Sequence, residues 1–245
     1  MRWICTAFIF VGLLSTAGAA EPLCKRLGHE GNSYSVCRVD LRETKLEIFN
    51  LDQEGQPLRN FSALADLVGD EGKELRFAMN AGMFDEDLKP IGLYVEDGEQ
   101  KKKLNRRDGQ GNFHLKPNGV FYVQGDELGV MTTEAYAKSD LRPDFATQSG
   151  PMLVIDGEIH PKFSETGTSL KVRNGVGMLD GQTAVFVISE NAVNFYDFAK
   201  VFRDALNCSN ALYFDGSVSS LYSPELGRND QFLPLGPMVG GLSLR

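Results

Sequence analysis

Short apolar runs bounded by glycine-containing turns recur along the chain and restrict it to a fold rich in β-strands. We expect strands where such runs alternate with polar residues or carry β-branched and aromatic side chains. The turn pair Asp180-Gly181 predicts a hairpin, and the first two expected strands are also interpreted as a hairpin or its equivalent. The expected strands cover 34–39, 45–49, 75–79, 92–95, 119–123, 151–155, 172–178, 183–188 and 211–214.

Two segments carry helical periodicity. Residues 61–68 predict a short helix, with Ser62 as the candidate cap, and 194–206 place Phe195, Phe198 and Phe202 on one face. An aromatic stripe of this kind is typical of a helix packed on a core. The remaining length fits one compact unit as readily as two. We therefore expect an α+β fold, a single domain with a large mixed β-sheet and two to three flanking helices.

The first twenty residues have the layout of a secretory signal peptide. Arg2 precedes an apolar run that ends in small residues at 17–20. We expect cleavage after Ala20 and export of 21–245 to the periplasm or the medium, with no stable membrane span afterwards. The alternative is an N-terminal anchor, for which the apolar run is short.

Cysteine placement agrees with an oxidising compartment. Cys24 and Cys37 would close a short N-terminal loop, so we predict a disulfide between them. Cys208 is then unpaired, and a buried free thiol is the preferred interpretation over a nucleophile.

The charge balance excludes a nucleic-acid partner. The formal net charge is −8, whereas phosphate backbones require stripes of Lys and Arg. The one basic cluster, Lys101 to Lys103 with Arg106 and Arg107, is flanked by acidic residues and is interpreted as a solvated loop.

Familiar catalytic motifs are absent from the sequence. It has no Gly-x-Ser-x-Gly elbow, no Walker loop and no His-Glu-x-x-His pair. Its three histidines are His29, His114 and His160, and His114 is expected in a strand, so a serine hydrolase is disfavoured. No cofactor is identified, and a divalent cation is compatible with the scattered Asp and Asn residues but is not indicated.

Five polar stretches containing glycine adjoin the expected strands. Each one alone is typical of a turn, but glycine also lets the backbone approach a ligand closely, and five together favour a shared pocket. Asp215 is singled out because it follows a helix and a buried strand, whereas most other Asp-Gly pairs lie between two strands. The stretches are MNAGMF (79–84), KPNGVF (116–121), QSGPML (148–153), KVRNGVG (171–177) and YFDGSVSSLY (213–222).

In this order the stretches resemble the phosphodiester glycosidase domain family, from about residue 34 to the C-terminus. The resemblance implies an α/β-type domain of mixed sheet that hydrolyses sugar-1-phosphodiesters. One departure is notable. The family commonly has Asp-Gly-Gly-Gly-Ser-Ser, whereas Ser217 and Val218 follow Asp215-Gly216 here. This difference bears on the substrate more than on the chemistry.

The implied reaction gives each polar residue a candidate role. Phosphate is a good leaving group, so a carboxylate that activates water or attacks the sugar is the main requirement. Asp215 is the first choice and Glu190 the second, although Glu190 would also suit the approach to a helix N-terminus. Arg173 is the candidate phosphate ligand, by a bidentate fork, ahead of Lys116.

Amide and hydroxyl groups complete the expected site. Asn80, Asn118 and Gln148 are candidates for binding sugar hydroxyls or phosphate oxygens. Ser149, Gly150, Gly216, Ser219 and Ser220 are candidates for lining an anion nest. The expected partner is a carbohydrate phosphodiester. Two alternatives stay open: a non-catalytic envelope protein that binds a glycan or anionic polymer, and a phosphodiesterase that cleaves the P–O bond.

Overall fold

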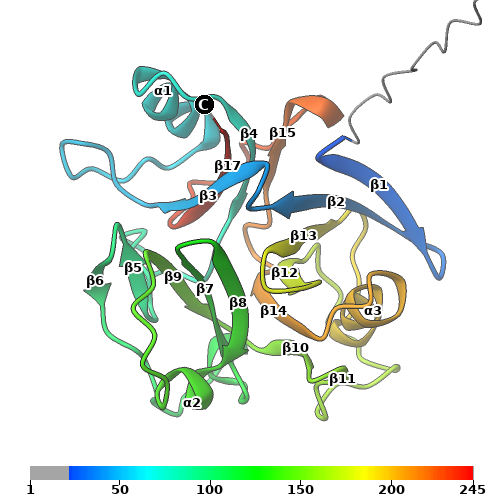
Figure 1. Ribbon diagram of the computed structural model, residues 1–245. Helices are drawn as coiled ribbons and strands as arrows, with labels where there is room; N and C mark the ends of the chain where they lie inside the picture. Colours follow the sequence, from blue (N-terminus) through cyan, green and yellow to red (C-terminus); the bar gives the residue numbers. More distant parts are fainter. Residues whose placement is uncertain (1–21, 245) are drawn as a thin grey trace, which may run out of the picture.

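Three antiparallel β-sheets form the protein in the computed structural model, which describes residues 22–244 (Figure 1). The expected signal peptide, residues 1–20, and its cleavage site lie outside the described residues. No helix within 22–244 is long and apolar enough to cross a membrane.

The seven-stranded sheet combines the first two strands of the chain with five strands from residues 152–215. Its central pair is the predicted hairpin, with Val176 opposite Phe186. In spatial order the strands are β1 (Cys24–His29), β2 (Asn32–Asp40), β13 (Thr183–Ser189), β12 (Asn174–Met178), β14 (Asn210–Asp215), β10 (Met152–Ile155) and β11 (Glu158–Ile159).

Two five-stranded sheets complete the architecture. The second sheet consists of β16 (Arg228–Asn229), β15 (Leu221–Ser223), β4 (Leu75–Asn80), β17 (Met238–Ser243) and β3 (Thr44–Phe49). The third sheet consists of β6 (Glu99–Lys102), β5 (Tyr94–Glu96), β9 (Phe145–Ser149), β7 (Gly119–Gln124) and β8 (Glu127–Thr132).

Helices cover the outer faces of two sheets. The Asn60 side chain caps α1 (Phe61–Asp70) by accepting from the Ala63 N–H at 2.9 Å, so the expectation of Ser62 as the cap is wrong by two residues. The expected helix 194–206 is α3 (Phe195–Lys200), capped by Asn194, followed by the π-helical turn η2 (Val201–Ala205). The shorter elements are α2 (Thr133–Tyr136) and the 3₁₀ turns η1 (Asn112–His114) and η3 (Pro224–Leu226). His114 therefore lies in a turn and not in a strand.

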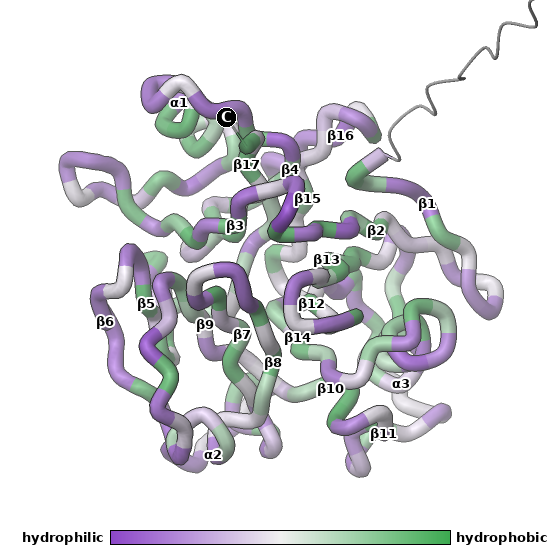
Figure 2. The backbone as a smooth tube through the Cα atoms, viewed as in Figure 1, coloured by the Kyte–Doolittle hydropathy of each residue, from purple (hydrophilic) through white to green (hydrophobic). Residues whose placement is uncertain are grey.

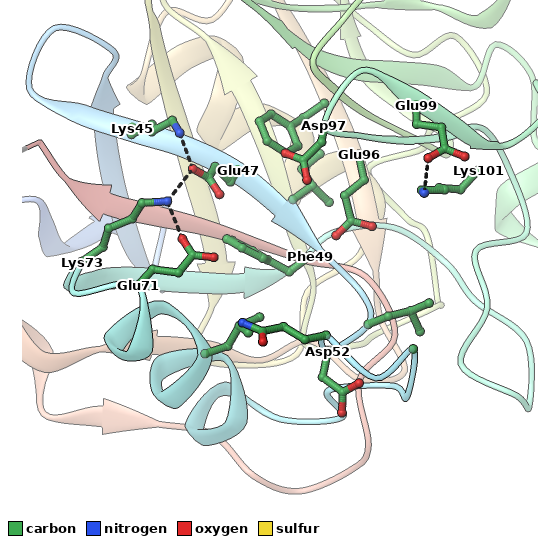
Figure 3. Close-up of a pocket in the computed structure, with 16 residues that line it drawn as sticks. Lys45, Glu47, Phe49, Asp52, Glu71, Lys73, Glu96, Asp97, Glu99 and Lys101 are labelled. Atoms are coloured by element: carbon green, nitrogen blue, oxygen red, sulfur yellow. Dashed lines mark hydrogen bonds and ion pairs between the residues drawn. The ribbon is translucent and has the colours of Figure 1, made fainter.

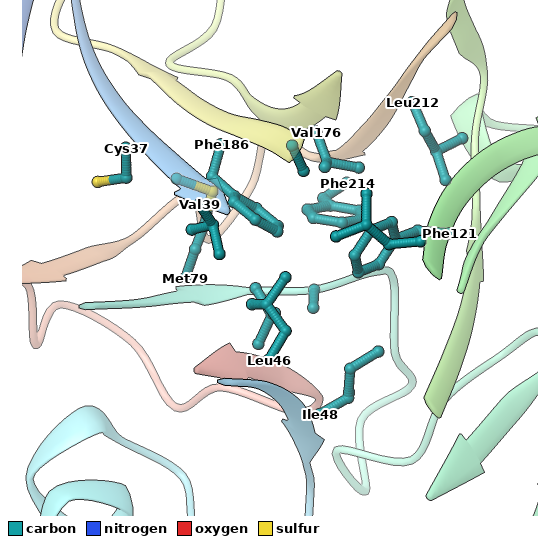
Figure 4. Packing of buried hydrophobic residues seen from close by; sticks show 14 of the residues in the cluster. Cys37, Val39, Leu46, Ile48, Met79, Phe121, Val176, Phe186, Leu212 and Phe214 are labelled. Atoms are coloured by element: carbon teal, nitrogen blue, oxygen red, sulfur yellow. The ribbon is translucent and has the colours of Figure 1, made fainter. Parts of the chain in front are cut away.

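A shared aromatic core joins the three sheets. Phe186 of the seven-stranded sheet lies 5.0 Å from Phe77 of the second sheet and 5.7 Å from Phe121 of the third, measured between ring centroids. Phe121 in turn contacts Phe214 at 6.3 Å, one residue before Asp215 (Figure 4). Hydrophobic chain segments gather where the sheets meet, and hydrophilic ones occupy many of the loop tips (Figure 2). The packing of all three sheets thus fixes the end of β14.

The expected single mixed sheet is wrong in its assembly, although most of its strands are present. Every strand pairing within 22–244 is antiparallel. The expected hairpin of 34–39 with 45–49 is also wrong, because β2 pairs with β1 and β13 while β3 pairs with β17. Alternation identifies a strand and its buried face, but not its partner, and these partners are remote in sequence.

A disulfide joins Cys24 to Cys37 across the first two strands, at a sequence separation of 13. Cys208 is a buried free thiol, and burial raises its pKa to about 12, which keeps it protonated and unreactive at neutral pH.

Loss of the disulfide should weaken the fold. Replacing Cys24 and Cys37 together by Ala is expected to lower the free energy of unfolding by about 3 kcal/mol, because the unfolded chain is no longer constrained. Urea unfolding of the oxidised protein, the reduced protein and the double variant measures this. The reduced protein and the variant should shift alike, and an unchanged midpoint on reduction would contradict the prediction.

Candidate active site

Asp215 ends β14 with one carboxylate oxygen fixed and the other without a hydrogen-bond partner among the described residues. Its Oδ1 accepts the backbone N–H groups of Gly216, Ser217 and Val218, the last at 3.4 Å. The side chain is nearly buried, with 8% exposure. Burial raises the pKa of Asp215, and the three N–H groups oppose this rise without cancelling it. The arrangement orients Oδ2 and leaves it available to water or a ligand.

Two asparagines and two serines tie the Asp215 turn to the neighbouring sheet. Asn174 Nδ2 donates to the Asn80 backbone oxygen at 2.8 Å and to Asn80 Oδ1 at 3.0 Å, and the same Oδ1 accepts the Ser220 N–H at 2.9 Å. Ser219 Oγ donates to the Asp215 carbonyl at 3.0 Å and lies 3.2 Å from Asn174 Oδ1. The structure therefore brings the predicted Asn80, Ser219 and Ser220 together with Asp215.

The prediction from sequence missed Asn174, which lies opposite Asp215 in the pairing of β12 with β14. A bulge follows Asn174 in this pairing, and the side chain is fully buried. An Asn-Gly step at the start of a strand was the available signal, but it is also a common turn dipeptide.

The stretches around Asn118 and Gly150 also adjoin the end of β14. Ser149 Oγ donates to the Phe214 carbonyl at 2.9 Å. A Cβ at Gly150 would lie 2.5 Å from Asn118 Cβ, so only glycine permits this approach. Asn118 itself is buried and donates to the Phe113 carbonyl at 2.8 Å. These residues therefore lie close to the last residues of β14, next to the Asp215 turn.

Gln148 is also buried, but its side chain is fully occupied within the protein. Its Oε1 accepts the N–H groups of Leu93 and Asn105, and its Nε2 donates to the Asn105 carbonyl and to Thr133 Oγ1. No hydrogen-bonding capacity is left for a ligand. Its role in this structure is to hold the chain from 93 to 105 against the third sheet.

Arg173 is a buried cation without a carboxylate partner among the described residues. Its guanidinium donates to the Val193 and Ser169 carbonyls, to Ser169 Oγ and to the Tyr213 hydroxyl, and it stacks 3.7 Å from the Phe195 ring centroid. The residue is 0% exposed, so it is not placed as an open fork for phosphate. Burial lowers the pKa of Arg173. Its charge can still act on an anion near the Asp215 turn, across a medium of low dielectric constant.

Glu190 and Lys116 have no direct contact with this cluster. Glu190 Oε1 pairs with Arg26 at 2.5 Å and with Arg228 at 2.6 Å and accepts from Ser35 Oγ. Burial alone would raise the pKa of Glu190, but the hydrogen bonds and the two cations lower it. Lys116 is partly exposed and pairs with Asp108 at 2.6 Å. The contacts of Glu190 are those of a structural ion pair, which leaves Asp215 as the carboxylate of the cluster.

Gly216 is required by close packing against Tyr213. A Cβ at position 216 would lie 2.1 Å from the Tyr213 hydroxyl oxygen and 3.5 Å from Arg173 Nη1. Ser217 and Val218, the two departures from the family motif, do not have a positive φ, so side chains are accommodated there. Val218 packs against the hydrophobic cluster that contains Phe61, Leu64 and Val68 of α1.

The clash at Gly216 can be tested by a double-mutant cycle. Gly216→Ala is expected to lower the free energy of unfolding by roughly 1–3 kcal/mol, because the new methyl group overpacks the turn. In a Tyr213→Phe background the same substitution should cost less than half as much, since the obstructing hydroxyl is gone. Thermal or urea unfolding of the four proteins measures both costs. Equal costs in the two backgrounds would contradict this explanation.

The comparisons with known proteins fit this arrangement. The family model for phosphodiester glycosidase matches residues 73–232, which include most of the polar cluster described above. The chain belongs to the phosphodiester glycosidase family. It is also 40% identical to the uncharacterized protein YigE of Escherichia coli over 184 residues, which is 75% of this chain and 72% of that protein.

Solved structures show the same fold at low sequence identity. The catalytic domain of zebrafish N-acetylglucosamine-1-phosphodiester alpha-N-acetylglucosaminidase, auto-inhibited by its pro-peptide, has a TM-score of 0.60 at 15% identity, covering 94% of this chain and 87% of that one. A hypothetical protein from Synechocystis has a TM-score of 0.53 at 13% identity, covering 90% and 61%. The family match and the shared fold confirm the resemblance inferred from the sequence. The phosphodiester glycosidase family is a hydrolase family.

No group of three or more His, Cys, Asp or Glu side chains is placed to hold a metal ion within residues 22–244. The cluster around Asp215 contains amide, hydroxyl and backbone N–H groups that hydrogen-bond within the cluster, and a single carboxylate, whose Oδ2 has no partner among the described residues.

Proposed function

We propose that this protein is an exported hydrolase that cleaves sugar-1-phosphodiester linkages in an envelope or extracellular glycan. Membership of the phosphodiester glycosidase family supports the reaction class. The name of the zebrafish enzyme suggests the substrate class, a sugar joined through its anomeric carbon to a phosphodiester. The layout of residues 1–20 motivates export.

The observation that carries the proposal is the carboxylate of Asp215. One oxygen is fixed by three N–H groups, the other has no hydrogen-bond partner among residues 22–244, and buried amides and hydroxyls of two further strands surround the turn. Oδ2 of Asp215 then either removes a proton from the attacking water or attacks the anomeric carbon itself.

A site with one carboxylate suits this substrate class. An ordinary glycoside requires a second carboxylic acid to protonate the leaving oxygen, whereas the phosphomonoester expelled from a sugar-1-phosphodiester leaves as a stabilised anion without that proton. The buried charge of Arg173 favours the accumulation of negative charge on the departing phosphate. Asn80 and Asn174 hold the turn in the geometry that this requires.

A substrate panel tests the proposal. Purified protein without the signal segment is incubated with sugar-1-phosphodiesters that differ in sugar and in aglycone, and released sugar is quantified by chromatography. We expect turnover of at least one member, with free sugar and a phosphomonoester as products. Release of sugar from none of them, together with binding of intact compounds, would instead support a glycan-binding protein.

The pH dependence of this reaction follows from the raised pKa of Asp215. As a base or nucleophile the carboxylate must be ionised, so kcat/KM should rise with pH through the pKa of the free enzyme. The acidic limb should therefore lie above the ordinary value for Asp of about 3.9. A profile that stays flat down to that value, or falls as pH rises through the acidic range, would contradict the assigned role.

A further inference from the structure

A cavity lies between the second and third sheets, away from the Asp215 turn. It has a volume of about 430 Å³, and its wall is formed by the segment after β3, the hairpin of β5 with β6, and the loop around Pro90. None of the residues that line this cavity belongs to the cluster around Asp215. The catalytic proposal therefore assigns it no role.

A buried polar atom in the wall of this cavity, Asn50 Oδ1, has no hydrogen-bond partner within the described residues. Its side chain is 5% exposed. A buried polar group without a partner costs free energy, so its retention in a cavity wall requires an explanation. A ligand group that donates a hydrogen bond would satisfy it. The Tyr94 hydroxyl, in a side chain that is 2% exposed, lies beside the Glu96 carboxyl.

The same cavity is lined by two carboxylates, Asp87 and Glu96, and by three lysines. Glu96 is half-buried, and burial is the main cause that raises its pKa to about 7, so near neutrality it both accepts and donates hydrogen bonds. Lys89 pairs with Asp87 and Lys101 with Glu99, whereas Lys102 has no ion-pair partner in the part of the chain described. Pro57 and Pro90 supply apolar surface.

An adjoining cavity of about 540 Å³ shares Leu51, Gly55, Glu96 and Lys101 with this cavity. Figure 3 shows this neighbour, in which the Glu96 carboxylate points into the space between β3 and the β5–β6 hairpin, above Phe49. The two cavities together form a groove with room for more than one residue of a glycan chain.

We propose that this groove is a second binding site, for a phosphorylated sugar or polyol. Hydroxyl groups of the ligand donate to Asn50 Oδ1 and Glu96 and exchange a hydrogen bond with Tyr94, the prolines contact its carbon skeleton, and the phosphate lies against Lys102 and Lys101. The site holds a polymer at a distance from Asp215, so binding there does not depend on catalysis. Its existence does not rest on the proposed reaction.

Amide chemical shifts of the ¹⁵N-labelled protein test this site separately from the Asp215 turn. The probes are N-acetylglucosamine 1-phosphate, glycerol 3-phosphate, N-acetylglucosamine and inorganic phosphate. We expect either phosphorylated probe to shift amides in 50–58 and 94–102 with a Kd in the millimolar range or tighter. The unphosphorylated sugar and inorganic phosphate should each bind at least tenfold more weakly, because each lacks half of the recognised groups.

Two variants and a matched control complete the experiment. Tyr94→Phe removes only the hydroxyl, and Lys102→Gln removes an exposed charge, so neither should disturb folding. Each should raise the Kd of the phosphorylated probes, measured at the amides of 50–58 and 94–102, by roughly tenfold. Lys138→Gln, at another exposed lysine, and Asp215→Asn should leave this Kd unchanged. Absence of shifts in these segments at 10 mM probe, on the order of the weakest affinity considered, would overturn the proposal. Equal affinity in Tyr94→Phe, Lys102→Gln and the unaltered protein would also overturn it.

Discussion

Replacing Asp215 by Asn is expected to reduce kcat on a sugar-1-phosphodiester by on the order of 1000-fold or more, while substrate affinity changes little. The amide cannot accept a proton from water or form a glycosyl intermediate, which removes the chemical step. The fold should survive, because the amide oxygen can still accept the N–H groups of Gly216 and Ser217. Because the substitution removes a buried carboxylate charge, the midpoint of thermal unfolding should be equal to or higher than that of the unaltered protein.

The matched control for this experiment is Asp156→Asn. Asp156 also precedes a glycine but lies exposed in the turn between β10 and β11, where it serves only the hairpin. Its substitution should leave kcat and KM unchanged. Asp215→Asn protein with undiminished turnover would remove Asp215 from the mechanism. Loss of affinity without any turnover in the unaltered protein would assign the site to binding alone.

Arg173→Met is expected to lower the free energy of unfolding by about 3 kcal/mol or more. The substitution keeps an unbranched side chain but removes four hydrogen bonds, and it leaves the buried carbonyls of Ser169 and Val193 and the Tyr213 hydroxyl without their donor. Removal of a buried charge offsets part of this cost. We expect the lost hydrogen bonds to dominate because the guanidinium is already solvated by protein groups.

Urea unfolding measures the effect, with Arg42→Met as the control. Arg42 pairs with Asp40 on the surface and should contribute little to stability. The folded molecules of the Arg173→Met variant should also show a reduced kcat, because the positive potential near the Asp215 turn is lost. A change in stability no larger than that of Arg42→Met would contradict the role assigned to the buried guanidinium.

The sequence was sufficient to predict most strands but not their assembly. Short runs rich in apolar, β-branched and aromatic residues located β2, β3, β4, β7 and β13 within a few residues, because these strands are buried at most of their positions. The prediction from sequence placed β2 and β3 in one hairpin and gave no strand for β1, where half of the residues are exposed. It also missed β6, β8, β9, β11, β15, β16 and β17. Contacts such as Phe77 with Phe186 decide which sheets meet, and such contacts are invisible to local periodicity.

The sequence also predicted part of the candidate site. Strand-end asparagine, serine and glycine residues identified the segments that surround Asp215, because close approach requires small or polar residues. Their individual roles depend on contacts across sheets: Gln148 is saturated by Leu93, Asn105 and Thr133, and Arg173 is covered by Phe195. Asn174 was missed because an Asn-Gly step looks the same in a turn and in a bulged strand.

Hydrolysis in ¹⁸O-labelled water tests the central claim most directly, by locating the bond that breaks in a sugar-1-phosphodiester. If Asp215 directs water to the anomeric carbon or attacks it, the C–O bond breaks and the label enters the released sugar. The account predicts label at the anomeric hydroxyl and none in the phosphomonoester. Label in the phosphomonoester would show P–O cleavage and would contradict the glycosidase mechanism.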